Sequence, residues 1–167
     1  ENLLLRMYDE PDSVAAVIGQ IVDYYAAVSE RIFEAAGDAI DIFFIGNDFG
    51  SQTGPLVGPA LFERFILPHL QRLINLGHDY GLPVQLHCCG GFEPLLPLLI
   101  DAGIDAVHAI QPFCRGMELA TLKARYGEQI VFNGAIDSQH VLIEGPSPEF
   151  VRDKTREVLR IMAPGGG

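Results

Sequence analysis

The sequence contains no tryptophan, only three cysteines, and half as many basic as acidic residues. With 11 Lys and Arg against 22 Asp and Glu, its net charge of −11 argues against non-specific binding to nucleic acids or to anionic membranes. A membrane-spanning helix needs a run of about 18 apolar residues, and none is present. We therefore expect neither a nucleic-acid-binding protein nor a membrane protein.

The three cysteines, Cys88, Cys89 and Cys114, are too few for a disulfide framework. Adjacent cysteines bond each other only with strain, and an odd number of thiols in a chain with no visible signal peptide indicates a reducing compartment. We therefore expect a cytoplasmic protein in which each thiol is a metal ligand, a nucleophile or a small core residue.

Four short apolar runs lack polar alternation, which is typical of strands that are covered on both faces. These predicted strands are Asp41–Ile45, Val84–Leu86, Ala106–Ile110 and Ile130–Phe132. Helical patterns lie around them at Asp12–Ala36, Pro59–Tyr80 (kinked or divided at Pro68), Phe92–Ala102, Glu118–Tyr126 and Ser147–Met162. Because strands alternate with helices, we predict an α/β fold with about four parallel βα units.

Polar and glycine-rich segments follow all four predicted strands. They contain Gly46-Asn47-Asp48, His87-Cys88-Cys89-Gly90-Gly91, Gln111-Pro112 and Asn133-Gly134-Ala135-Ile136-Asp137. Reactive groups of parallel α/β proteins gather at these strand ends, so we expect the four segments to line one cavity. The sequence lacks both the dinucleotide-binding glycine pattern and the P-loop pattern, so it gives no support to either kind of nucleotide site.

The triplet His87-Cys88-Cys89 carries the strongest chemical signal. On an extended segment, residues two apart point to the same side, so His87 and Cys89 can converge on one ion. Imidazole and thiolate are zinc ligands, but a zinc site usually needs a third protein group. Asp48, Cys114 and His108 are in-chain candidates without diagnostic spacing, and the alternative is that His87 and the thiols are core residues.

Two aspartates stand near strand ends, and each has functional and structural interpretations. Asp48 is a general acid/base or a substrate-binding acceptor, or it caps the loop that follows it. Asp137 has the same choices, because it also precedes a short helix predicted near Gln139–Ile143. His108 lies inside a predicted strand, where we interpret it as a core or layer residue.

The order of these motifs resembles the uroporphyrinogen decarboxylase superfamily, which also contains cobalamin-dependent methyltransferases. The resemblance rests on segments 46–55, 62–68, 87–91, 111–112 and 133–137. It implies a partial (β/α)₈ TIM barrel, with residues 1–167 as the C-terminal part of the barrel domain. A whole barrel takes about 250 residues, and only four strands are predicted here. We therefore expect open sheet edges and a homo-oligomer.

The methyltransferase branch of the family has a His-x-Cys zinc motif, and His87 and Cys89 match it. This match implies a zinc cofactor that activates a thiol, which attacks the methyl group of a corrinoid. The family's third ligand is usually a cysteine on the last strand, which we expect beyond Gly167. A corrinoid protein is the macromolecular partner that this branch implies.

The decarboxylase branch needs no cofactor and acts on the acetate groups of a tetrapyrrole, with an aspartate near the pyrrole nitrogens. Asn47-Asp48 and Asp137-Ser138 both depart from its usual residues, and its Arg-rich motif would precede Glu1. Methyl transfer is therefore our first expectation, decarboxylation the second, and a non-catalytic half-barrel the third.

We expect the same residue set to serve a small-molecule substrate in either enzyme. The expected catalytic residues are Asp48 and Asp137, and the expected zinc ligands are His87 and Cys89. The expected substrate-binding residues are Asn47, Gln52, Gln111 and Asn133.

Overall fold

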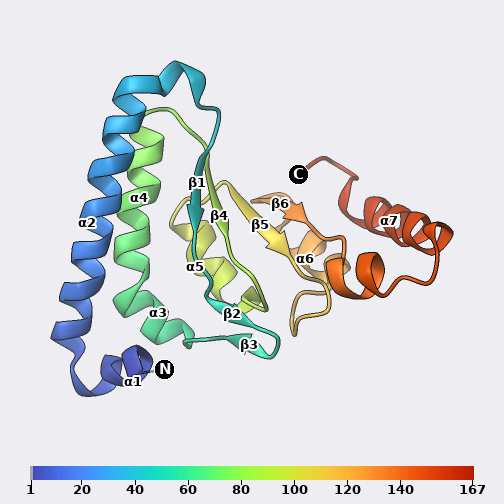
Figure 1. Ribbon diagram of the computed structural model, residues 1–167, viewed down its shortest axis with the longest axis horizontal. Coiled ribbons are helices and arrows are strands. Elements are labelled where there is room, and N and C mark those ends of the chain that lie inside the picture. The colour runs from blue at the N-terminus through green and yellow to red at the C-terminus, as the bar shows by residue number, and fades with distance from the viewer. Residues whose placement is uncertain (1) are drawn as a thin grey trace.

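Four parallel strands form the centre of the structure, a computed structural model that describes residues 2–167 (Figure 1). They are β1 (Phe43–Gly46), β4 (Val84–His87), β5 (Ala106–Ile110) and β6 (Val131–Gly134), in the spatial order β1-β4-β5-β6. All four predicted strands are present, with ends that differ by at most two residues from the predicted ranges. The predicted α/β arrangement is therefore confirmed.

The predicted helices are also present. They are α2 (Pro11–Ala36), α3 (Pro59–Phe65), α4 (Leu67–Asp79), α5 (Leu96–Asp101, after a 3₁₀ turn at Glu93–Leu95), α6 (Leu119–Tyr126) and α7 (Pro148–Met162). The predicted division near Pro68 falls at Ile66, between α3 and α4. Proline has no N–H to donate to the preceding turn, so it is accommodated in the first turn of the new helix α4.

Helix α1 (Asn2–Asp9), which precedes α2, and a small hairpin that pairs β2 (Gly50–Ser51) with β3 (Gly54–Pro55) were not predicted from the sequence. The short helix predicted near Gln139–Ile143 is present as a π-helix over Ser138–Ile143. Strands of two residues are too short to show hydrophobic alternation, which is why the hairpin escaped the sequence pattern. The hairpin contacts the turn after β4 through the bridge between Ser51 and Gly91.

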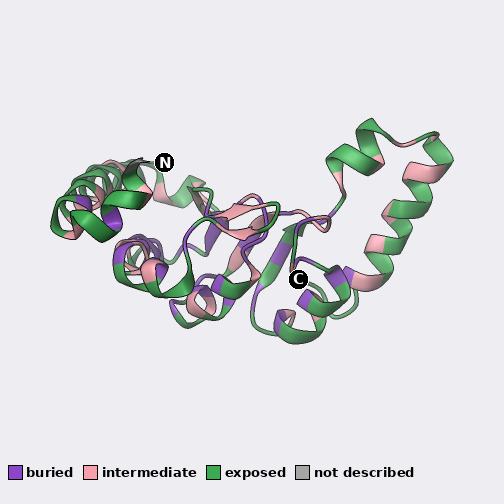
Figure 2. Ribbon diagram, turned by 90° about the horizontal axis from the view of Figure 1, so that it is seen from below, coloured by how far each residue is buried: buried purple, intermediate pink, exposed green. Residues whose placement is uncertain are grey.

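The two faces of the sheet differ. Val84, Leu86 and Val107 are fully buried against the helices. The opposite face contains the register row Phe44, Gln85, Ala106 and Val131 and the row Gly46, His87, His108 and Asn133. Phe44 and Val131 on the other face are 50% and 46% exposed, whereas the buried residues coloured purple in Figure 2 gather where helices pack against the sheet. The polar strand ends therefore border an open face.

Among the described residues, no helix combines the length and the apolar character that crossing a bilayer requires.

Candidate metal centre

The candidate site lies where β1 and β4 end side by side. Gly46 pairs in register with His87, and the amide of Asn47 continues the ladder by donating to the His87 carbonyl at 3.2 Å. The chain segments after both strands therefore leave the sheet together. This places Asp48 beside Cys89.

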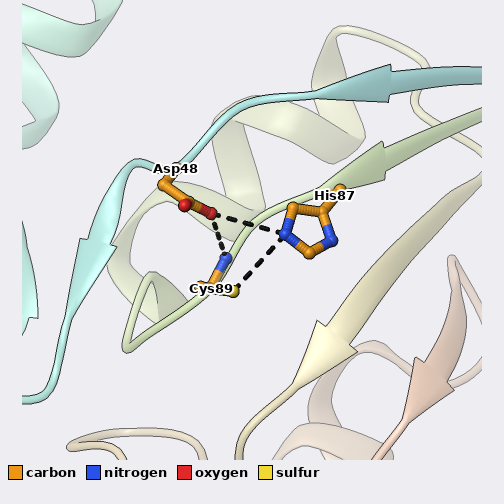
Figure 3. A group of neighbouring side chains, drawn as sticks. All are labelled: Asp48, His87 and Cys89. Atoms are coloured by element: carbon orange, nitrogen blue, oxygen red, sulfur yellow. Dashed lines mark hydrogen bonds and ion pairs between the residues drawn. The ribbon is translucent and has the colours of Figure 1, made fainter.

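Three side chains converge at this point (Figure 3). Nε2 of His87 is 3.4 Å from Sγ of Cys89 and 3.6 Å from Oδ1 of Asp48, and the same carboxylate oxygen accepts the Cys89 amide at 2.8 Å. The three ligand atoms all lie within 4.8 Å of one another. Of the three in-chain candidates for a third ligand, the structure brings Asp48 into this group.

The neighbouring thiol points the other way. Cys88 is fully buried against the helices, and its sulfur accepts the amide of Phe49 at 3.3 Å. The ring of Phe49 in turn packs edge-on against Phe62, with centroids 5.0 Å apart. Alternation along the extended segment thus separates a core thiol from a site thiol, as expected.

Two glycines allow the β2–β3 hairpin to cross the turn after Cys89. A Cβ on Gly50 would lie 2.5 Å from the Cys89 carbonyl oxygen, and a Cβ on Gly90, whose φ is +84°, would lie 2.5 Å from the Gly50 carbonyl carbon. The amide of Gly91 donates to the Ser51 carbonyl at 2.7 Å. This close backbone packing joins the segments that carry Asp48 and Cys89.

The site disfavours a free thiolate. Burial and the nearby Asp48 carboxylate raise the pKa of Cys89, and burial raises the pKa of Cys88 to about 11. Both sulfurs therefore carry a proton at neutral pH. A metal ion bound by Cys89 must displace that proton, because the thiolate is the ligand form.

Gln111 supports the same turn from the neighbouring strand. Its Oε1 accepts the amide of Gly90 at 2.8 Å and the thiol of Cys114 at 3.6 Å. Cys114 is buried, and the partner of its thiol is Oε1 of Gln111. Gln111, expected as a substrate-binding residue, is thus placed to hold the turn after Cys89 in position.

His108 is a layer residue, as one of its two interpretations predicted, but its contact with His87 was not predicted. It lies in the side-chain layer on the open face, and its Nδ1 is 2.7 Å from Nδ1 of His87. The sequence shows only that His108 lies in the strand that follows the His87 strand, and the structure adds that the two residues are in register. The sequence alone does not show register, so this pairing could not be read directly.

Of the remaining predicted site residues, Asn47 directly precedes Asp48, Gln52 lies in the turn between β2 and β3, and Asn133 lies on β6. Asn47 and Gln52 are exposed, and the Gln52 carbonyl accepts the Arg115 amide at 3.0 Å. Asn133 is exposed on β6 and pairs in register with His108. These side chains are therefore accessible from solvent.

Asp137 caps the π-helix. Its Oδ1 accepts the amides of Gln139 and His140 at 2.9 and 3.0 Å, and its Oδ2 pairs with the His140 ring at 2.7 Å. Burial raises the pKa of Asp137, but these hydrogen bonds and the His140 ring outweigh burial and leave it below the usual value. These contacts support the interpretation of Asp137 as a helix cap.

Comparison with known proteins places these features in context. A sequence model of the family Uroporphyrinogen decarboxylase (URO-D) matches residues 1–167. The chain is 28% identical over 101 residues to the uroporphyrinogen decarboxylase of Syntrophotalea carbinolica, which covers 60% of this chain and 27% of the relative. It is 22% identical over 154 residues to the methylcobamide:CoM methyltransferase MtbA of Methanosarcina mazei, covering 92% and 42% of the two chains.

A solved structure gives the same fold. A methyltransferase from Methanosarcina mazei superposes with a TM-score of 0.73 at 18% sequence identity, covering 98% of this chain and 44% of that one. The chain thus spans less than half the length of these relatives, and the predicted partial-barrel α/β fold is confirmed. The match along the whole chain shows that it belongs to the uroporphyrinogen decarboxylase (URO-D) family.

Proposed function

We propose that the protein catalyses zinc-dependent methyl transfer from a corrinoid carrier to a thiol acceptor. The observation that carries the proposal is the convergence of Asp48, His87 and Cys89, whose ligand atoms lie within 4.8 Å of one another. Relatives named methylcobamide:CoM methyltransferase, matched over 92% and 97% of the chain, support this choice within the family.

The three side chains suit a zinc ion. One carboxylate oxygen, one imidazole nitrogen and one sulfur form a donor set that zinc accepts. With Asp48 in place of the cysteine expected beyond Gly167, three protein ligands would leave a fourth position for a substrate atom. In the proposed site, His87 Nε2, Cys89 Sγ and Asp48 Oδ1 would hold the ion. Bound zinc would supply a Lewis acid that lowers the pKa of an acceptor thiol.

The protein's own residues would prepare this step. Asp48 is oriented by the Cys89 amide, and Gln111 holds the Gly90 amide, so the ligand turn is constrained from two sides. The acceptor loses its S–H proton to solvent, its sulfur bonds the methyl carbon, and the electron pair of the broken cobalt–carbon bond stays on the corrinoid. A corrinoid carrier would approach this position from the face of the sheet on which Phe44 and Val131 are exposed.

The exposed polar residues at neighbouring strand ends are the proposed substrate contacts. Asn47, Gln52 and Asn133 are exposed, and Gln111 is half-buried. We assign Asp137 to the same rim, with its cap to the π-helix as its structural role. A corrinoid protein would supply the methyl group.

A matched pair of variants tests the proposal. Cys89→Ser removes the site thiol, whereas Cys88→Ala removes the adjacent thiol that faces the core. We expect zinc-loaded wild type and Cys88→Ala to consume methylcobalamin in the presence of coenzyme M. The reaction is monitored by the loss of the absorbance of the cobalt–carbon bond. Cys89→Ser should lose both zinc and turnover, and turnover that survives Cys89→Ser would contradict the proposal.

Decarboxylation of uroporphyrinogen is the second candidate. Relatives named uroporphyrinogen decarboxylase match at 28% and 31% identity over 101 residues, above the 20% and 22% of the methyltransferases. Asp48 would then serve as the acceptor beneath the tetrapyrrole. Release of carbon dioxide from uroporphyrinogen by metal-free protein, sensitive to Asp48→Asn and insensitive to Cys89→Ser, would favour this candidate.

Self-association is a proposal of another class. Within residues 2–167, β1 and β6 each pair on one side of the main sheet, and the face between them exposes Phe44 and Val131. Unpaired strand edges favour pairing with a second copy. Light scattering coupled to size-exclusion chromatography should detect a dimer or larger species, and a monomer at all concentrations would exclude this association.

A further inference from the structure

Strand β5 contains a bulge that changes which side chains share a face. Val107 and Ile110, three positions apart, are both buried in the core, at 0% and 3% exposure. The register shifts between His108 and Ile110, and Ala109 between them has a φ of +70°. The bulge therefore puts His108 and Gln111 on the same open side of the sheet, where simple alternation would separate them.

Both of these side chains contact the segment that carries the proposed ligands. Gln111 accepts the Gly90 amide, and His108 meets the ring of His87 with 2.7 Å between the two Nδ1 atoms. The ring of Phe44 packs against His108 with centroids 5.4 Å apart, which limits how the His108 ring can turn. His108 on β5 and Gln111 just after it thus support the segment from His87 to Gly90 at two points.

The two Nδ1 atoms, 2.7 Å apart, can hold only one proton between them, so one ring donates and the other accepts. If His108 donated it, neutral His87 would carry its own proton on Nε2, and the Asp48 oxygen at 3.6 Å is too distant to accept it well. The sulfur of Cys89 at 3.4 Å is only a weak acceptor. The better arrangement has His87 donating through Nδ1, because the protonated thiol of Cys89, 3.4 Å away, can then donate to the free lone pair of Nε2.

We propose that His108 is a positioning residue that holds His87 with its proton on Nδ1 and its Nε2 free to bind a metal ion. This inference rests on the proposed metal site. Metal-binding histidines usually donate their second nitrogen to an acceptor that sets tautomer and ring orientation. Here the acceptor is a second imidazole, which must then carry its own proton on Nε2.

Three variants separate this role from a general loss of structure. His108→Asn keeps an acceptor oxygen near the position of Nδ1, and His108→Leu removes the acceptor. His78→Leu is the matched control, because His78 also pairs with a side chain, Asp105, at 2.8 Å but is not among the site residues. Thermal unfolding of all three establishes that each is folded before metal is added.

Cobalt(II) is the metal probe, and the affinity is read from its absorption spectrum. We expect His108→Leu to weaken cobalt binding by about 10–100-fold, the range usual for loss of such a partner. His108→Asn and His78→Leu should bind nearly as tightly as wild type. Equal affinities of wild type and His108→Leu, or equal losses in His108→Asn and His108→Leu, would overturn the inference.

A metal-free measurement separates this inference from the proposed function. Long-range proton–nitrogen spectra of ¹⁵N-labelled protein resolve the tautomers of its five histidines. We expect His87 to carry its proton on Nδ1 in wild type and to lose this single tautomer in His108→Leu. If wild type binds no cobalt but shows that tautomer, the proposed metal function fails while the role of His108 stands; an Nε2-protonated His87 would reject the role itself.

Discussion

Replacing Gly50 by alanine tests whether the β2–β3 hairpin holds the candidate site together. The added Cβ would lie 2.5 Å from the Cys89 carbonyl oxygen and 2.9 Å from the Gly90 carbonyl carbon. Both neighbours are backbone atoms, so no flexible side chain can move aside. The hairpin and the turn after Cys89 must therefore separate.

The size of the effect follows from these distances. Ordinary contact begins near 3.4 Å, so the two segments must move apart by about 1 Å. Overpacking of this kind costs about 1–3 kcal/mol, and each kcal/mol lowers the melting temperature by about 2–4 °C in a chain of this size. Metal ligands need to stay within about 0.5 Å of their positions, so a shift of about 1 Å between the segments of Asp48 and Cys89 should disrupt metal binding.

Calorimetry and cobalt(II) titration measure the two effects separately. We expect Gly50→Ala to melt about 5 °C lower and to bind cobalt about 10–100-fold more weakly than wild type. Gly37→Ala is the matched control, because no other group lies within 4 Å of its added Cβ. An unchanged cobalt affinity in Gly50→Ala would refute the argument that this crossing positions the ligands.

Three further predictions concern other parts of the chain. Ala109→Gly should raise the melting temperature, because alanine at a φ of +70° carries a strain of about 1–2 kcal/mol that glycine lacks; an unchanged or lower temperature would contradict this. Burial and the Glu93 hydrogen bond raise the pKa of Tyr126 from 10.0 to about 12, so its contribution to stability should be complete below pH 10 and be lost as the pH rises through about 12. Urea unfolding of wild type and Tyr126→Phe across this range checks the sign, and parallel curves would refute it. Asp137→Ala should lower the unfolding free energy by about 1 kcal/mol through loss of the cap to the π-helix, as measured by urea unfolding at pH 7; no change would show that the cap contributes little.

The fold was largely predictable because each strand and helix has a local signature. The run Ala106–Ile110 is apolar and β-branched enough to mark its strand, and Pro68 marks the division between α3 and α4. The hairpin at Gly50–Pro55 has no such pattern, since it depends on close approach to the turn after Cys89. Short elements defined by tertiary contact leave little trace in local periodicity.

The candidate site was predictable in part for the same reason. Alternation within one extended segment places His87 and Cys89 together, and this follows from sequence alone. Selection of Asp48 among three possible third ligands requires the register of β1 with β4. The contact of His108 with His87 requires the register of β4 with β5, which sequence periodicity does not encode.

Zinc stoichiometry tests the central claim most directly. Purified wild type, Cys89→Ser, Asp48→Asn and Cys88→Ala would be dialysed against zinc, separated from free metal and analysed for zinc per chain. The proposed site predicts one zinc per chain in wild type and Cys88→Ala, with loss in Cys89→Ser and weakened retention in Asp48→Asn. Background zinc in wild type, or equal zinc in wild type and Cys89→Ser, would contradict it.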